Sequence, residues 1–303
     1  MGSGSMLKYY LKELFNVMFI VTPLCAFVGI AFAAEFTKIS VVDAGLILLA
    51  MAFANMAVDT LNDYADYKHG IDFETVHTKF SGGPMTLLVD KKIKPKPTLA
   101  MALIIFAIAL SIGAYFVIKV PALAIIVAIG AITILLYSHF FLYTKFLAEP
   151  MLALIYTLVP LGSFIAITES TSRLANALFV SLPIGIIVAL VLLINEVPDR
   201  DVDKKHGRKS IAVLVYNLGA LSKIYLSFQL VGIAILIVGA ALQEVPYTAL
   251  LALLSFPFML RAYFGFAKYK TPKQFERYMA SDVAYFLSFT LLLSIGLLIP
   301  VVV

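Results

Sequence analysis

Nine stretches of mostly apolar residues follow one another along the chain, and short polar segments separate them. Each stretch is about 20 residues long, which is the length of an α-helix that crosses the hydrocarbon core of a bilayer. The pattern therefore predicts an all-α integral membrane protein in which nine transmembrane helices form one bundle. The stretches cover residues 14–34, 42–66, 98–118, 121–139, 150–168, 174–197, 221–242, 246–266 and 281–302.

The first five residues differ in character from the rest of the chain. Residues 1–5 have the sequence Met-Gly-Ser-Gly-Ser, precede a second methionine, and are interpreted as a cloning scar. The first apolar stretch lacks the small-residue cleavage site of a signal peptide, so we expect it to remain as a helix. We expect residues 6–303 to form a single polytopic domain.

The composition excludes several classes of protein. Apolar residues make up 62% of the 303 residues and charged residues 14%, whereas a soluble domain has about 45–50% and about 25%. These values exclude a soluble globular protein, a disordered chain and a nucleic-acid-binding protein. The chain has one cysteine, Cys25, so it forms no intrachain disulfide.

The basic residues predict how the helices are oriented. If nine helices alternate in direction, all but three of the 23 Lys and Arg residues fall on the side of the N-terminus, the exceptions being Lys38, Lys119 and Arg173. Positively charged loops face the cytoplasm. We therefore expect a protein of the cell membrane with its N-terminus and the polar loops 67–97 and 198–220 in the cytoplasm.

An acidic cluster lies at the cytoplasmic end of the second predicted helix. At 100° per residue, its polar side chains share an arc of about 100° on one face of that helix. Carboxylates near a bilayer are costly and usually mark a functional site. The members of the cluster are Asn55, Asp59, Asn62, Asp63 and Asp66.

A second cluster repeats this arrangement at the cytoplasmic end of the sixth helix. Asn195, Asp199 and Asp203 are spaced i, i+4 and i+8, while Glu196 and Asp201 lie nearby and are less well aligned. Both clusters contain Asn-[Asp/Glu]-x-x-Asp, and both run into Lys-His-Gly. Because the copies are four helices apart, we expect a pseudo-repeat of helices 1–4 and 5–8, followed by a ninth helix.

The chemistry of these side chains favours a metal–diphosphate site. Oxygen ligands without thiolates suit Mg²⁺, which is usually shared between carboxylates and substrate phosphates. Two acidic stripes facing each other around two or more Mg²⁺ ions would bind a diphosphate. The alternative is that the acids only solvate the helix ends and pair with neighbouring lysines, which two matched stripes on one membrane face make less plausible.

Other polar residues on the same side are candidates for contacts with the phosphates. Gly82 and Gly83 allow a close approach of the backbone to an anion. The side chains expected to bind substrate are Lys79, Ser81, Tyr137, Ser138, Lys145 and Lys209, together with Asn55, Asn62 and Asn195 of the clusters.

At these positions the sequence resembles the UbiA superfamily of intramembrane prenyltransferases. Members of that family have nine transmembrane helices and Asp-rich motifs on the second and sixth. The resemblance covers the whole hydropathy layout and is most specific at residues 55–72, 79–83 and 195–212. It is strongest to the menaquinone-biosynthesis branch, which prenylates dihydroxynaphthoate. Many members have Arg-Pro in the first helix, where this chain has Thr22-Pro23.

The resemblance implies Mg²⁺-dependent transfer of an isoprenyl chain from an allylic diphosphate to an aromatic acceptor, at a central cavity within the membrane. It implies that the catalytic metal ligands are Asp59, Asp63, Asp66, Asp199 and Asp203. One alternative is prenyl transfer to a glycerol-phosphate lipid alcohol, which would use the same donor site. Another is an ion-coupled transporter, but transporter acids tend to lie near the bilayer midplane, and these lie at the cytoplasmic ends.

Overall fold

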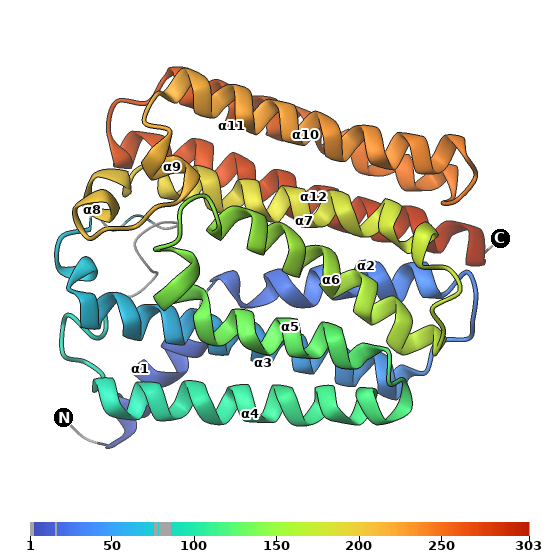
Figure 1. The fold of residues 1–303 in the computed structure, drawn as a ribbon, viewed down its shortest axis with the longest axis horizontal. Helices are drawn as coiled ribbons and strands as arrows, with labels where there is room; N and C mark the ends of the chain where they lie inside the picture. The colour runs from blue at the N-terminus through green and yellow to red at the C-terminus, as the bar shows by residue number, and fades with distance from the viewer. Residues whose placement is uncertain (1–2, 16, 76–77, 79–85, 303) are drawn as a thin grey trace.

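The protein was analysed as a computed structural model that describes residues 3–15, 17–75, 78 and 86–302. These residues form helices and connecting segments, and no strand occurs among them. The long helices lie side by side in one bundle, with α4 (Pro95–Lys119) at one edge and α10 (Leu218–Ala241) toward the other (Figure 1). The prediction of an all-α bundle is confirmed.

Eight helical segments in the described ranges are long and apolar enough to cross a membrane. Two of them change helix type along their length, because α5 continues as the π-helical segment η3 and the 3₁₀ segment η4 continues as α11. Besides α4 and α10, they are α3 (Val41–His69), α5 (Leu123–Leu136) with η3 (Tyr137–Phe141), α6 (Ala148–Thr168), α7 (Leu174–Glu196), η4 (Tyr247–Ser255) with α11 (Phe256–Ala267), and α12 (Pro272–Val302).

The first predicted helix is divided, so the count of nine spanning helices is not confirmed. In place of one helix over residues 14–34, the structure has the end of α1 (Ser3–Leu14), a turn η1 (Val17–Ile20) and α2 (Val21–Ala33). With 13 residues, α2 is about 20 Å long at 1.5 Å per residue. That length is less than the hydrocarbon thickness of about 30 Å.

Small residues allow α2, α6 and α7 to pack closely in the middle of the bundle. A Cβ atom on Gly29 of α2 would lie 1.9 Å from the carbonyl oxygen of Pro160 in α6. A Cβ atom on Gly185 of α7 would lie 2.2 Å from the carbonyl oxygen of Ala153, also in α6. Close approach through small residues is typical of helices packed within membranes.

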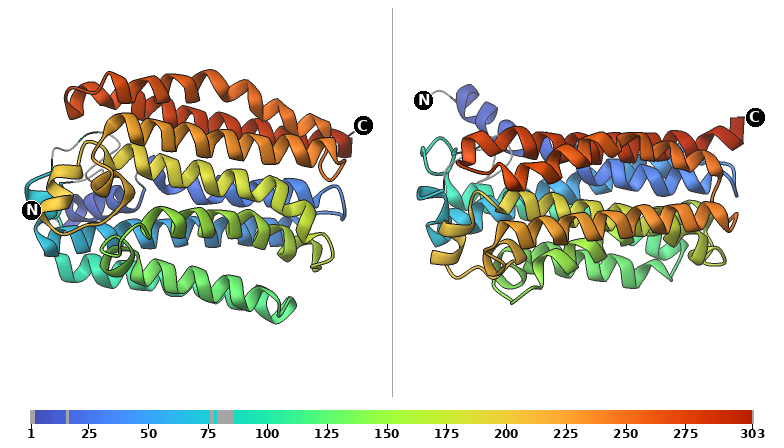
Figure 2. Two further views of the ribbon diagram at one scale, coloured as in Figure 1. Left: turned by 45° about the horizontal axis from the view of Figure 1, so that its top comes forward. Right: turned by 90° about the horizontal axis from the view of Figure 1, so that it is seen from above.

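The two Lys-His-Gly sequences end helices next to each other. Gly70 (φ 80°) caps α3 and Gly207 (φ 84°) follows α8 (Arg200–Lys205), and both adopt the left-handed conformation that glycine tolerates best. A Cβ atom on Gly70 would lie 3.9 Å from Cε1 of His206. The structure thereby brings the two predicted acidic clusters to the same end of the bundle, where α8 and α9 (Ile211–Leu214) lie (Figure 2).

Candidate active site

A cavity of about 580 Å³ runs into the bundle from the end that carries α8. Its walls come from α3, α4, α5, α6, α7 and α12. Near α8 the lining is acidic, and farther along it is formed by side chains such as Ile47, Phe106, Ile126, Leu158 and Val191. The cavity therefore joins a polar mouth to an apolar interior.

The first acidic cluster lies along this cavity. All five of its members line the wall that α3 contributes, as expected for polar residues that share one helix face. Asp63 and Asp66 are 8% and 7% exposed. The predicted stripe of Asn and Asp residues thus faces the interior of the bundle rather than solvent.

Hydrogen bonds fix the orientation of this stripe. The Thr22 hydroxyl donates to Oδ1 of Asn55 at 2.5 Å, and Nδ2 of Asn55 donates to Oδ2 of Asp59 at 2.8 Å. Tyr156 of α6 lies 3.1 Å from the Thr22 hydroxyl. Thr22 therefore positions Asp59 through Asn55.

The second cluster comes from the end of α7 and from α8. Asn195, Glu196, Asp199 and Asp203 all line the same cavity. In the described structure, Oδ1 of Asn195 and Oε2 of Glu196 are buried without a hydrogen-bond partner. Unsatisfied buried polar atoms are costly, so these two oxygens are suited to a ligand that enters the cavity.

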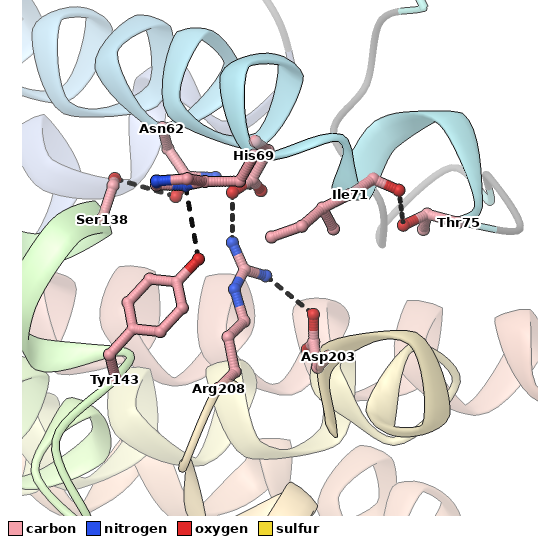
Figure 3. Close-up of polar contacts among 9 residues, drawn as sticks. Asn62, His69, Ile71, Thr75, Ser138, Tyr143, Asp203 and Arg208 are labelled. Atoms are coloured by element: carbon pink, nitrogen blue, oxygen red, sulfur yellow. Dashed lines mark hydrogen bonds and ion pairs between the residues drawn. The ribbon is translucent and has the colours of Figure 1, made fainter. Parts of the chain in front are cut away.

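Arg208 connects the two clusters (Figure 3). Its guanidinium group forms ion pairs with Asp66 of α3 and with Asp203 of α8, the latter at 2.9 Å. The side chain of Arg208 is only 10% exposed. Burial raises the pKa of Asp203, and the charge of Arg208 opposes that increase. A single cation therefore lies between acids from the two halves of the sequence.

The segment that carries Arg208 is held against α6 and against the connection between η3 and α6. Lys209 donates its backbone N–H to the carbonyl of Leu142 at 2.8 Å and accepts from the N–H of Phe146 at 3.0 Å. The buried carboxylate of Glu149 accepts from the N–H of Ile211 at 2.6 Å. These bonds set the position from which Arg208 reaches the two acids.

Asp72 adds a further carboxyl group to the mouth of the cavity. It lies in the short segment η2 (Ile71–Phe73) directly after Gly70 and is 8% exposed. Burial and the nearby charge of Asp66 raise the pKa of Asp72 to about 7.

The other predicted substrate-binding residues have different positions. Tyr137 lines the cavity, and the hydroxyl of Ser138 donates to Oδ1 of Asn62 at 3.0 Å. The side chains of Lys145 and Lys209 are exposed and are not part of the cavity lining. Lys79 and Ser81 lie outside the described residues.

The charges around the cavity are strongly unbalanced. Arg208 is the only Lys, Arg or His residue in the described lining, which contains the carboxyl groups of Asp59, Asp63, Asp66, Asp72, Glu196, Asp199 and Asp203. Within the described part of the chain, no three His, Cys, Asp or Glu side chains converge closely enough to hold a metal ion by themselves. The site is thus suited to cations that arrive together with an anionic ligand.

Comparison with known proteins identifies the family. The sequence profile of the UbiA prenyltransferase family matches residues 22–297. The chain belongs to the UbiA prenyltransferase family. The matched region includes both acidic clusters and Arg208, and it contains all of the described cavity lining except Ile20 and Val21.

One relative and two solved structures show how far the similarity extends. The 1,4-dihydroxy-2-naphthoate octaprenyltransferase of Bacillus subtilis (strain 168) is 31% identical over 268 residues, which cover 84% of this chain and 82% of the relative. A UbiA homolog from Aeropyrum pernix K1 has a TM-score of 0.70 at 17% identity and covers 89% of this chain and 96% of its own. A UbiA homolog from Archaeoglobus fulgidus, solved with DMAPP and Mg²⁺, has a TM-score of 0.59 at 17% identity, covering 94% and 99%.

Sequence reasoning missed several residues of the site. It counted Arg208 only as a basic loop residue, and it assigned no role to Asp72 or Tyr156. Arg208 follows the second Lys-His-Gly directly, and this juxtaposition with an acidic motif was the available signal. Tyr156 belongs to an apolar stretch, and nothing in its spacing distinguishes it from a packing residue.

Proposed function

We propose that this UbiA-family enzyme transfers an isoprenyl chain from an allylic diphosphate to an aromatic acceptor, in an Mg²⁺-dependent reaction at the cytoplasmic face of the cell membrane. The observation that carries the proposal is one cavity with an acidic mouth and an apolar interior. A donor with a charged diphosphate and a hydrocarbon tail needs both parts. The acceptor class rests on the relative that is named for 1,4-dihydroxy-2-naphthoate.

The donor groups at the mouth fit Mg²⁺. The described lining offers carboxylate and amide oxygens and contains no Cys or His side chain, which is the ligand set of a hard cation. When bound, Mg²⁺ would neutralise the diphosphate and make it a better leaving group. The residues proposed to hold two or more such ions are Asp59, Asp63, Asp66, Asp199 and Asp203.

Polar residues of the chain hold these carboxylates in place. Asn55 orients Asp59, and Arg208 holds Asp66 and Asp203 at a fixed separation. The Nε atom of Arg208 is buried and has no hydrogen-bond partner among the described residues, and guanidinium donors suit phosphate oxygens. The unsatisfied oxygen of Asn195 is available for a donor group of the ligand or of its hydration shell.

The apolar interior is long enough for a prenyl tail. Both Asp66 and Ile47 line the cavity, and the 19 residues between them along α3 correspond to about 28 Å at 1.5 Å per residue. Apolar walls also exclude water from the reacting allylic carbon, where it would otherwise intercept a carbocation.

The proposed reaction is an electrophilic substitution on the aromatic ring. The allylic C–O bond breaks, and its electron pair leaves with the diphosphate. A ring carbon of the acceptor forms the new C–C bond. The ring then loses the substituent that it carried at that carbon, which is either a proton or a carboxyl group released as CO₂.

The test uses purified protein in detergent with Mg²⁺, allylic diphosphates of increasing length, and two acceptors. One acceptor is 1,4-dihydroxy-2-naphthoate and the other is a glycerol-phosphate lipid alcohol. Prenylated naphthoate product together with free diphosphate, both abolished by EDTA, is the expected result. Product from the lipid alcohol alone would contradict the proposed acceptor but not the donor chemistry. No diphosphate release with either acceptor would contradict the proposal as a whole.

A further inference from the structure

Helix α1 lies outside the main bundle and differs from the spanning helices. Figure 2 shows it at the same end as α8, close to the N-terminus. Two of its apolar side chains, Leu7 and Leu11, are 61% and 46% exposed, and Phe15 directly after the helix is 57% exposed. A short helix with exposed apolar residues and with lysines, here Lys8 and Lys12, is typical of a helix that lies in the membrane interface.

Glu13 is the most deeply buried residue among the described side chains of this helix. The residue is only 3% exposed. Its carboxyl group forms a hydrogen bond with Asp63 of the first acidic cluster, and it lies near the negative charge of Asp59. Its Oε1 atom is buried and has no hydrogen-bond partner in the described structure. An acid on an interfacial helix is thus placed beside the cavity.

The surroundings of Glu13 differ from those of the acids near Arg208. Asp66 and Asp203 share the positive charge of Arg208, whereas no described Lys or Arg forms an ion pair with Glu13 or Asp63. Two carboxyl groups buried together without a cation are costly unless a cation or a proton joins them.

We propose that Glu13 and Asp63 together form a cation position of the diphosphate site, so that α1 supplies a metal ligand from outside the bundle. This inference rests on the proposed function. Mg²⁺ is commonly held by one or two carboxylates together with substrate phosphates. A two-carboxylate position is therefore complete only when diphosphate oxygens are present, which agrees with the lack of a closed metal cluster among the described residues.

The Glu13→Gln variant separates this role from a structural one. Glutamine is neutral but can still hydrogen-bond with Asp63, so it preserves the contact that seats α1 while removing the negative charge. Glu35→Gln is the matched control, because Glu35 is exposed and follows α2 at the opposite end of the bundle. Both variants change the same residue type and remove one charge.

The experiment measures Mn²⁺ binding to purified protein in detergent by electron paramagnetic resonance, with and without inorganic pyrophosphate. We expect wild type and Glu35→Gln to bind Mn²⁺ tightly only with pyrophosphate, and Glu13→Gln to bind at least one ion roughly tenfold more weakly, a typical loss when a group supporting a metal site is removed. Equal Mn²⁺ affinity in Glu13→Gln and wild type would overturn the inference and leave the proposed function intact. Failure of the wild type to bind Mn²⁺ with pyrophosphate would overturn both.

Discussion

Arg208 forms an ion pair with Asp66, although the two residues are 142 positions apart and belong to different acidic motifs. The same guanidinium group pairs with Asp203 at 2.9 Å. All three side chains are at most 10% exposed. Because a buried charge is stable only when it is compensated, Arg208 is the residue that permits the two acidic segments to meet in one cavity.

Arg208→Ala is expected to lower prenyl transfer by about 100-fold or more, as is typical when one preorganised charged group of an active site is removed. The loss should exceed the effect of Lys209→Ala, since the Lys209 side chain is exposed and its structural bonds come from the backbone. Turnover and detergent-solubilised yield would be measured for both variants. Equal activities in the two would show that Arg208 has no part in the reaction.

Asp199 and Asp201 are two positions apart, and comparing variants of the two tests the assignment of metal ligands. Asp199 lines the cavity, whereas Asp201 is exposed and accepts a hydrogen bond from the Tyr216 hydroxyl at 2.9 Å. We expect Asp199→Asn to reduce turnover by about 100-fold or more and Asp201→Asn to leave it within about twofold of wild type. An assay of diphosphate release would show the difference. The assignment of metal ligands fails if both variants retain wild-type rates.

Much of the fold and half of the site could be predicted because they depend on local periodicity. The Asn and Asp side chains between positions 55 and 66 share a face at 100° per residue, and that face does line the cavity. The same argument cannot place Arg208, because its distance from Asp66 depends on how α3, α8 and the segment after Gly207 pack together. No spacing rule links residues 142 positions apart.

The N-terminal region shows a second limit of the sequence pattern. Hydropathy marks residues 14–34 as one stretch, yet the chain turns at η1 and forms a separate helix α2. The sequence pattern does not predict the inward position of Glu13 either, because a single acid at the edge of an apolar stretch resembles an ordinary solvated residue. Only tertiary packing of α1 beside α3 brings Glu13 to Asp63.

The length of the bound tail should depend on Gly130. This residue lines the cavity, and a Cβ atom there would meet nothing within 4 Å, so Gly130→Phe should fill open space without strain. Gly130 is seven residues before Tyr137, about 10 Å along the helix axis. We expect Gly130→Phe to retain activity with the shortest allylic donors and to lose roughly tenfold or more with long ones.

Donor-length profiles from product analysis would check this prediction. Gly45→Phe is the control, since a Cβ atom on Gly45 also meets nothing within 4 Å but Gly45 is not part of the described cavity lining. Its profile should match that of the wild type. A Gly130→Phe profile that falls uniformly for all donors would instead indicate a general packing defect.

The stability of the metal-free protein should decrease as the pH rises, because Asp72 is buried beside other acids. Its pKa in the folded protein is raised to about 7 from an ordinary value of 3.8. An acid with a raised pKa contributes stability that is fully present below about 3.8 and is lost as the pH rises through about 7. The melting temperature in EDTA should therefore fall by several degrees between about pH 5 and about pH 8.

The single cysteine, Cys25, is fully buried, so a thiol-reactive dye can report unfolding. Asp72→Asn should make the profile less steep, Asp201→Asn should not, and Mg²⁺ with pyrophosphate should restore stability at the higher pH. An Asp72→Asn profile parallel to that of the wild type would contradict this account of the charges at the cavity mouth.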